Sequence, residues 1–276
     1  MSPHAEAFRR LVRERSGLVL TPDKDYLLKS RLEPLAREAG LPGAPELLAA
    51  AVREPGGALA ARAVDALATH ESSFFRDGTP FEQLRASMLP ALVAARRPGA
   101  RLRVWSAACS SGQEPYSLAM LFAEQAHVLA GRAVDILATD MSEPILAKAR
   151  TGLYSDFEVS RGLSPERRDR WMVREDASWR VAPDLARTVR FARHNLLEGP
   201  PPAGLFDLIF CRNVLIYFDA EGKRAALTRL HAAMEPDAAL VVGGAETLVG
   251  FEGLFRPVNG LRGVMRRAGA EQRLAG

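Results

Sequence analysis

The sequence predicts an α/β protein in which an all-helical N-terminal region precedes a sheet whose strands alternate with helices. Residues 4–97 carry apolar residues at helical spacing, and from Leu102 the pattern changes to βα alternation. The stretch from Arg103 to Ser117 predicts a buried strand, a turn of small residues and a helix. Because a strand, a tight turn and a helix open a nucleotide-binding α/β sheet, we expect such a unit here.

The composition is that of an ordinary globular protein, with 276 residues of which 47% are hydrophobic and 25% charged. No apolar run approaches the roughly 20 residues that cross a bilayer, so no membrane insertion is expected. The first residues, Met1–Glu6, lack the basic start and apolar core of a secretory signal. Cys109 and Cys211 are the only cysteines, which predicts a reducing, cytoplasmic setting without disulfides. Zinc binding by so few cysteines and five histidines is not expected.

The net charge of +4 is unevenly distributed. Residues 8–37 hold eight basic side chains against four acidic ones. The basic residues of this stretch are Arg9, Arg10, Arg13, Arg15, Lys24, Lys29, Arg31 and Arg37. A surface for an acidic partner and a solvated helix face are both consistent with this pattern. Nucleic-acid binding is not expected, because no aromatic residues are interleaved with the basic ones.

The N-terminal region is predicted to form several short helices. A first helix follows the spacing of Phe8, Leu11 and Val12 and is interrupted at Gly17, and Thr21-Pro22-Asp23 predicts the cap of a second. The further helices are expected at residues 46–53 and 58–69 and from Thr79-Pro80 onward. Pro98 and Gly99 mark a linker, so we expect a helical domain at residues 1–97 and a second domain at residues 98–276.

The second domain is predicted to contain five strands of the main sheet, at residues 102–107, 134–139, 189–194, 206–211 and 238–244. Helices are expected after Ser142 and at residues 220–234. Between Tyr154 and Thr188 the alternation breaks, and two short strand-like runs are joined by Arg174–Ser178. These runs predict a small inserted antiparallel β element at about residues 155–188. It is basic, since residues 161–193 hold nine arginines and five acidic residues.

The turn after the first strand is a candidate ligand site. Ser110, Ser111 and Gly112 have so little side-chain bulk that a ligand could lie against their backbone. Glu114 and Pro115 suit the first turn of the following helix. The Gly-x-Gly-x-x-Gly pattern is absent, which argues against a dinucleotide site. An ordinary βα loop without a ligand explains the stretch equally well.

Polar side chains also follow two other predicted strands. An acidic residue such as Asp140, at the end of its strand, can accept hydrogen bonds from ribose hydroxyls, although it could instead help Ser142 to cap a helix. Arg212 and Asn213 follow the buried strand at residues 206–211 and should lie at its carboxyl end. Tyr217 comes four residues after Asn213 and could lean over the same place.

Together these segments resemble the chemoreceptor glutamate O-methyltransferases of the CheR family. That family uses S-adenosylmethionine on a Rossmann-like sheet behind an N-terminal helical domain. The runs that carry the resemblance are Ser73–Arg76, Trp105–Met120, Ala138–Asp140, His194–Leu196, Phe206–Phe218 and Gly243–Glu246. They are spread over nearly the whole chain, and the resemblance therefore implies the same fold and the same cofactor.

The resemblance also implies roles for individual residues. The side chains of His70, Ser72, Arg76 and Glu114 would surround the methionyl part of the cofactor. Asp140 would hold the ribose, and Asn195 and Leu196 would meet the adenine. Arg212 and Asn213 would close the site, and Arg76 and Tyr217 would act at the transferred methyl group. The family often has Asn where His70 stands and Glu where Gln113 stands, so we assign the acidic contact to Glu114.

The implied reaction is direct methyl transfer from S-adenosylmethionine to a glutamate carboxylate of a chemoreceptor, leaving S-adenosylhomocysteine. A monomer is expected. Because the Arg174–Ser178 turn is short and lacks glycine, we expect no requirement for a peptide tether at the receptor C-terminus. Two other readings stay open: a regulatory module that binds the cofactor and receptors without efficient catalysis, which His70 favours, and a nicotinamide-dependent dehydrogenase. The missing glycine pattern and the lack of a well-placed catalytic His or Lys disfavour the dehydrogenase.

Overall fold

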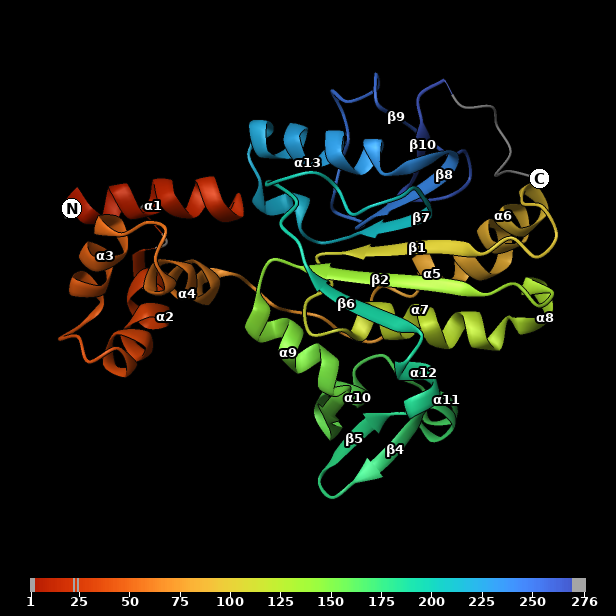
Figure 1. Ribbon diagram of the computed structural model, residues 1–276, viewed down its shortest axis with the longest axis horizontal. Helices are drawn as coiled ribbons and strands as arrows, with labels where there is room; N and C mark the ends of the chain where they lie inside the picture. Colours follow the sequence, from red (N-terminus) through yellow and green to blue (C-terminus); the bar gives the residue numbers. More distant parts are fainter. Residues whose placement is uncertain (1–2, 22, 24, 270–276) are drawn as a thin grey trace. The chain divides into compact units, whose positions relative to one another are not determined.

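The structure, a computed structural model, describes residues 3–21, 23 and 25–269 (Figure 1). Its contacts divide the chain into two units, one with Met1–Thr69 and Tyr217–Lys223, the other with His70–Ile216 and Arg224–Gly276. The expected domain limit lay at the Pro98-Gly99 linker, whereas the contacts group residues 70–97 with the sheet. The reason is packing: apolar side chains of residues 74–92, among them Phe81 and Leu89, belong to the core cluster that includes the strands.

The described residues of the first unit form the helices α1 (Pro3–Ser16), α2 (Asp25–Glu38), α3 (Ala44–Arg53) and α4 (Ala58–Leu67), together with the start of a later helix. Apolar residues at three- and four-residue spacing form its core, and the most deeply buried include Phe8, Val12, Leu32 and Leu47. The helical character predicted for this region is confirmed. Pro22 of the expected cap and Lys24 of the basic stretch lie outside the described residues.

The second unit is built on a seven-stranded sheet with the order β6-β2-β1-β7-β8-β10-β9. The strands are β1 (Leu102–Ala107), β2 (Val134–Asp140), β6 (Val189–Arg193), β7 (Phe206–Cys211), β8 (Met234–Val242), β9 (Phe255–Pro257) and β10 (Val264–Arg267). The first five in this order pair in parallel, and β10 pairs antiparallel with both β8 and β9. Parallel pairing requires crossover connections, which the helices between the strands supply.

The five strands predicted from the sequence are all present, and β1 and β7 have the predicted bounds. β8 begins at Met234, before Pro236, because its pairing with β7 shifts register between Phe206 and Leu208 and so accommodates the proline. β9 and β10 were not predicted. They are only three and four residues long, and their arginines interrupt the apolar pattern on which a strand prediction depends.

The helices of the second unit come from several parts of the chain. Ahead of β1 lie α5 (Thr79–Gln83), the π-helical turn η2 (Leu84–Met88) and α6 (Leu89–Ala95). The helices that follow strands are α7 (Gln113–Glu124), α8 (Ala126–Leu129), α9 (Glu143–Thr151) and α13 (Ala220–Ala232), of which α13 spans the division between the units. α7 and α9 contact β2 and β6 (Figure 1). The apolar side chains between these helices and the strands hold the sheet edge that carries the candidate site.

The inserted element is a three-stranded antiparallel sheet with the order β3-β5-β4. Its elements are β3 (Leu153–Ser155), α10 (Asp156–Ser160), α11 (Pro165–Trp171), β4 (Met172–Glu175), β5 (Ser178–Val181) and α12 (Pro183–Ala186). The predicted pair of strands is therefore confirmed, and β3 is an addition. Figure 1 shows the β4–β5 hairpin standing apart from the main sheet. Its turn is only Asp176-Ala177, with Asp176 in the left-handed region at φ 48°.

Candidate active site

The candidate site lies where the strand order of the sheet reverses direction. From β1 the chain continues to β2 and then β6 on one side, whereas β7, β8 and β10 lie on the other side. In open α/β sheets, ligands bind at the carboxyl ends of the strands at such a switch point. The carboxyl ends of β1 and β7 are Ala107 and Cys211, which pair directly with each other. The residues just after these two strands are therefore the first candidates for ligand contacts.

The turn after β1 is shaped mainly by packing against the protein. Gly112 has φ 93°, and a Cβ atom there would lie 3.0 Å from both the Ala149 Cβ and the Tyr154 hydroxyl. The Tyr154 hydroxyl also donates to the Ser111 carbonyl at 2.7 Å. Gly112 and the Ser111 carbonyl thus contact protein side chains, and the Ser110 hydroxyl donates to the His70 carbonyl at 3.2 Å. A ligand against this turn stays a prediction.

Asp140 ends β2, and its buried carboxylate binds backbone on both sides. One oxygen accepts the Ser110 N–H at 2.9 Å and the other accepts the Ser142 N–H at 3.0 Å. The helix-capping role left open by the sequence is therefore present. A carboxylate offers about four acceptor positions, so two backbone bonds are compatible with further bonds from a ribose diol. The ribose contact itself stays a prediction.

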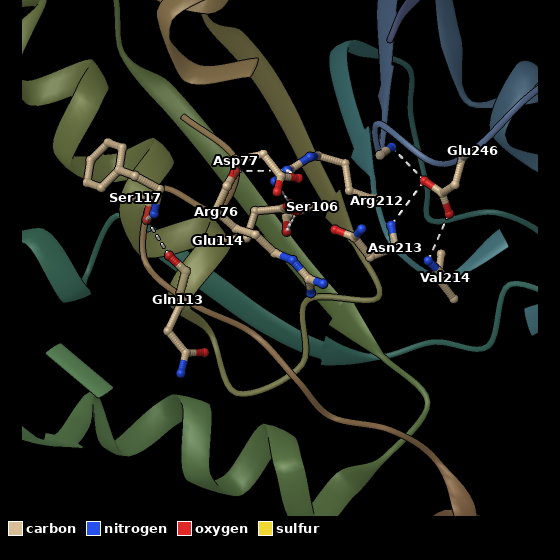
Figure 2. A network of polar contacts seen from close by, with 12 residues as sticks. Arg76, Asp77, Ser106, Gln113, Glu114, Ser117, Arg212, Asn213, Val214 and Glu246 are labelled. Carbon is tan, nitrogen blue, oxygen red and sulfur yellow. Dashed lines mark hydrogen bonds and ion pairs between the residues drawn. The ribbon is translucent and has the colours of Figure 1, made fainter. Parts of the chain in front are cut away.

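Arg212 connects three parts of the site through one buried guanidinium (Figure 2). Its side chain is 1% exposed. One terminal nitrogen donates to Glu114 Oε2 at 3.1 Å, and the other donates to the Arg76 carbonyl at 2.9 Å and to Asp77 Oδ2 at 2.7 Å. These bonds connect the end of β7 to α7 and to the segment before α5. Both terminal nitrogens are used on the protein, so the expected contact between Arg212 and the cofactor stays a prediction.

Glu114 sits in the first turn of α7 with both carboxylate oxygens occupied. Oε1 accepts the Ser106 hydroxyl at 2.8 Å, and Oε2 accepts the bond from Arg212 (Figure 2). Burial raises the pKa of Glu114 above its usual range, although Arg212 and Ser106 stabilise the charged form and act in the other direction. A charged group in such surroundings is held rigidly, because moving it would leave a buried charge without its partners.

Arg76 lies at the end of the irregular segment that precedes α5. Its guanidinium donates to the Glu71 carbonyl at 2.9 Å, and its own carbonyl accepts from Arg212. The side chain is half-buried, so it remains accessible to a ligand. His70 and Ser72 lie on the same segment, both half-buried, and His70 contacts the β1 turn through its carbonyl. The structure thus brings the segment to the site, while the cofactor contacts of these three residues stay predictions.

Asn195 and Leu196 follow β6 at the same edge of the sheet. The Asn195 side-chain oxygen accepts the Leu197 N–H at 3.0 Å, which closes a local turn, and Leu196 is buried. The strand end is joined to β2 by the His194 N–H, which donates to the Asp140 carbonyl at 2.9 Å. Asp140 therefore ends one strand and Asn195 follows the adjacent one. The predicted adenine and ribose contacts stay predictions.

Tyr217 is the one predicted site residue that the contacts place in the first unit. It ends the 3-10 helix η3 (Leu215–Tyr217), and its carbonyl accepts the Val19 N–H at 3.3 Å. Its assignment to the transferred methyl group stays a prediction from the resemblance.

Glu246 is a site residue to which the sequence reasoning gave no role. Its carboxylate accepts four backbone N–H groups, from Asn213 and Gly243 on Oε2 at 3.0 and 2.5 Å and from Val214 and Leu215 on Oε1 at 2.9 and 2.7 Å. Figure 2 shows the bonds from Asn213 and Val214. These bonds hold Asn213 in the left-handed region at φ 58°. A Cβ atom at residue 243 would lie 2.8 Å from Glu246 Oε2, so glycine is needed there. The sequence signal that could have indicated this role is a glutamate three residues after Gly243, just beyond a buried strand.

Two protein-family models match the chain, and together they cover most of its length. Residues 70–264 match the family model described as "CheR methyltransferase, SAM binding domain", and residues 3–68 match "CheR methyltransferase, all-alpha domain". The fold and the site therefore define an S-adenosylmethionine-dependent methyltransferase. The chain belongs to the CheR methyltransferase family, and its methylation serves chemotaxis.

Two chemotaxis methyltransferases support this assignment over nearly the whole chain. Chemotaxis protein methyltransferase 1 of Pseudomonas aeruginosa is 41% identical over 267 residues, which are 95% of this chain and 97% of that protein. Chemotaxis protein methyltransferase Cher2 of Pseudomonas putida is 38% identical over 267 residues, with the same shares. Among solved structures, a TehB-like SAM-dependent methyltransferase from Corynebacterium glutamicum is 15% identical, with a TM-score of 0.38, over 69% of this chain and 95% of that one.

Other types of site are not indicated. In the part of the chain that the structure describes, no group of three or more His, Cys, Asp or Glu side chains could hold a metal ion. None of the helices among the described residues is long and apolar enough to span a membrane. Burial raises the pKa of both thiols, Cys109 and Cys211, so neither is an activated nucleophile in this conformation.

Proposed function

We propose that the protein is a protein-glutamate O-methyltransferase that forms methyl esters on the cytoplasmic helices of chemoreceptors and so supports chemotaxis adaptation. The observation that carries this proposal is the junction at the switch point, where Arg212 joins Glu114 of α7 to the Arg76–Asp77 segment. This junction brings a half-buried arginine to the sheet edge where the cofactor is expected. Such an arginine suits an anionic substrate group, because a guanidinium can bind both oxygens of a carboxylate.

The residues at the sheet edge fit S-adenosylmethionine. The Asp140 carboxylate suits the ribose hydroxyls, and the Asn195 amide, just after the adjacent strand β6, suits the adenine edge. Glu114 supplies negative charge where the methionyl ammonium and the sulfonium would lie, and His70, Ser72 and Arg76 border that place. Leu196 offers an apolar surface for the base, and Asn213 completes the edge after β7.

The reaction needs orientation more than acid–base catalysis. When bound, S-adenosylmethionine supplies a methyl group on a sulfonium, and its transfer to a carboxylate oxygen gives a methyl ester and S-adenosylhomocysteine with no proton to move. A glutamate side chain is already ionised at pH 7, so no general base is required. We assign to Arg76 the alignment of the substrate carboxylate, and to Tyr217 a position near the methyl group. Alignment of this kind can supply about 7–11 kcal/mol of the barrier.

The receptor-docking surface that we propose lies on α2. Several basic residues of the N-terminal stretch are used within their own unit: Arg9 pairs with Asp25, and Arg31 donates to the carbonyls of Leu67 and Ala68. By contrast, Tyr26, Lys29 and Arg37 recur at helical spacing and are exposed, with Tyr26 67% exposed. A basic stripe with one aromatic residue suits an acidic receptor helix. We further propose that the enzyme acts in the cytoplasm as a monomer.

The decisive experiment is transfer of a labelled methyl group to chemoreceptors, with Arg76→Ala as the test variant. We expect alkali-labile label on receptor glutamates with the parent protein, and turnover reduced about 100-fold in the variant, because misplacement of the reacting groups is costly. Arg85→Ala is the matched control, since Arg85 is an exposed arginine in η2 that pairs only locally with Glu82. Near-parental turnover of Arg76→Ala would refute its role, and unlabelled receptors would refute the proposed function.

A further inference from the structure

The segment that carries Arg76 cannot hold its conformation by itself. Residues 70–77 form neither helix nor strand, and Phe75 and Asp77 lie in the left-handed region at φ 46° and 68°. Non-glycine residues persist in such conformations only when their surroundings impose them. Part of that support comes from the sheet side, where the Phe75 N–H donates to the Ser117 hydroxyl at 2.9 Å and Arg212 binds the carbonyl of Arg76 (Figure 2).

The other part of the support comes from the inserted element. A Cβ atom at Gly162, which has φ 104°, would lie 1.8 Å from the Phe74 carbonyl oxygen, so the chain between α10 and α11 is pressed directly against the segment. The ring of Phe74 packs edge-on against Tyr154 of β3, with ring centroids 5.0 Å apart. Arg161 pairs with Glu71 at 3.1 Å. The inserted element therefore touches the segment from Glu71 to Phe75.

Arg167 of α11 makes the most specific of these contacts. Its guanidinium carbon lies 3.9 Å from the centre of the Phe75 ring, within the range of a cation–π interaction. Two of its nitrogens donate to the two carboxylate oxygens of Glu124 at 3.0 and 2.9 Å, and Glu124 also accepts from Trp171 at 3.2 Å. Because Glu124 ends α7, the guanidinium is fixed to the core of the methyltransferase unit and forms a rigid cover for Phe75.

We propose that the inserted element is part of the active-site support, and that Arg167 is a positioning residue that holds Phe75, and through it Arg76, in place. The proposal gives the element a role in catalysis itself, in addition to any contact with receptors. It rests on the proposed function only for the assignment of Arg76 to the substrate carboxylate. It also implies that a partner bound to the inserted element can alter turnover by moving α11.

The test compares Arg167→Ala with Arg168→Ala, the neighbouring arginine of the same helix. Arg168 is a matched control because it also stacks on an aromatic ring, Trp179 at 4.8 Å, and pairs with an acidic residue, Asp169, while its interactions among the described residues stay within the inserted element. The two side chains are similarly exposed, at 28% and 36%. For each variant, kcat and KM for receptor, the affinity for S-adenosylhomocysteine by calorimetry and the Tm are measured, with kinetics well below the Tm.

We expect Arg167→Ala to lower kcat about tenfold with an unchanged receptor KM, since misplacing a catalytic group slows chemistry more than binding. It should also weaken S-adenosylhomocysteine binding severalfold, whereas Arg168→Ala should leave both at parental values. Arg167→Lys, which keeps the charge beside Glu124 but not the planar stack, should recover part of the loss. Equal kcat and equal affinity in the two alanine variants would overturn the proposal, even if the Tm of one is lower. If the parent protein itself methylates no receptor, the proposed function is refuted. The role of Arg167 is then judged only by comparing the S-adenosylhomocysteine affinities of Arg167→Ala and Arg168→Ala.

Discussion

At the scale of single residues, Glu246 shows how one side chain can impose a backbone conformation. Four N–H groups from two separate segments converge on its carboxylate, and hydrogen bonds to a charged acceptor are among the stronger ones in proteins. One of these donors, Asn213, lies two residues after the end of β7 and has a left-handed φ of 58°. We infer that Glu246 acts on the site only through this loop.

Glu246→Gln should therefore weaken both stability and cofactor binding. A glutamine offers one acceptor oxygen, and its NH2 group would face N–H donors, so about 1–3 kcal/mol of unfolding free energy should be lost. The affinity for S-adenosylhomocysteine should fall as well, because Asn213 is released. Glu252→Gln is the control, since Glu252 is exposed and accepts the Gly250 N–H at 2.9 Å within its own turn. Urea unfolding and calorimetry on both variants would show whether the two effects belong to Glu246 alone.

His194 is a residue whose burial makes stability depend on pH. Its Nε2 atom is buried and lacks a hydrogen-bond partner among the described residues, and its ring packs against Trp105. Burial, with a contribution from Arg229, lowers the pKa of His194. The unfolded chain therefore takes up this proton at a higher pH than the folded chain does, so acidification favours unfolding.

As the pH falls, the loss of folding stability should begin at pH about 6.5, where a histidine of the unfolded chain titrates. It should continue down to the lowered pKa that His194 has in the folded protein. Above that window His194 is neutral in both states and contributes no pH dependence. We expect His194→Gln to show a smaller fall in Tm between pH about 7.5 and 5.5 than the parent protein. Part of the fall should remain, because burial also lowers the pKa of His231. If the Tm of His194→Gln falls with pH as steeply as that of the parent protein, His194 does not cause the loss of stability at low pH.

At the scale of elements, the inserted β element divides into two functional parts. β3, α11 and the turn between α10 and α11 contact the segment before α5, whereas the β4–β5 hairpin stands apart from the main sheet (Figure 1). The hairpin turn has two residues, Asp176 and Ala177, and neither is glycine. On this basis we keep the prediction that no receptor tether peptide is needed.

The tether prediction is tested by titrating the protein with the C-terminal peptides of chemoreceptors. We expect no heat of binding at peptide concentrations up to the millimolar range, and equal methylation of receptors with and without their last residues. Deleting the β4–β5 turn residues serves as a control for nonspecific binding to the basic surface. Tight binding of a receptor C-terminal peptide, lost in that control, would contradict the prediction.

At the scale of the whole molecule, charge is expected to govern the encounter with the receptor. The chain carries a net charge of +4, and the exposed basic residues of α2 face an acidic helical substrate in the proposed complex. Exposed charges are screened over about 10 Å at 0.1 M salt, so such an attraction weakens quickly as salt is added.

Methylation at low receptor concentration should therefore slow steeply between about 0.05 and 0.3 M NaCl. The double variant Lys29→Glu, Arg37→Glu should be slower than the parent at low salt and nearly independent of salt. Arg53→Glu, an exposed charge reversal on α3, is the control and should keep most of the salt dependence. A flat salt profile of the parent enzyme would exclude electrostatic docking through α2.

Sequence patterns were sufficient wherever neighbouring residues decide the structure. β1 and β7 run as buried apolar strands that end in polar residues, so their bounds and the placement of Glu114, Arg212 and Asn213 near one sheet edge follow from local patterns alone. Asp140 was placed at a strand end by the same reasoning, whereas Asn195 was named only through the resemblance. The resemblance to a known family then supplied the cofactor and the reaction, which no local pattern could name.

The tertiary structure decided which groups those side chains bind. The partners of Arg212 lie 98, 135 and 136 residues away in the sequence, and the N–H groups that Glu246 holds lie up to 33 residues away. β3 pairs with β5 of the inserted sheet, and Arg167 packs on Phe75. Both contacts join segments whose local sequence patterns do not indicate them. Hydrogen bonds and ring contacts depend on distances between folded segments, whereas strand and helix patterns depend on residues a few positions apart. For that reason the location of the site could be predicted from the sequence, and its internal connections could not.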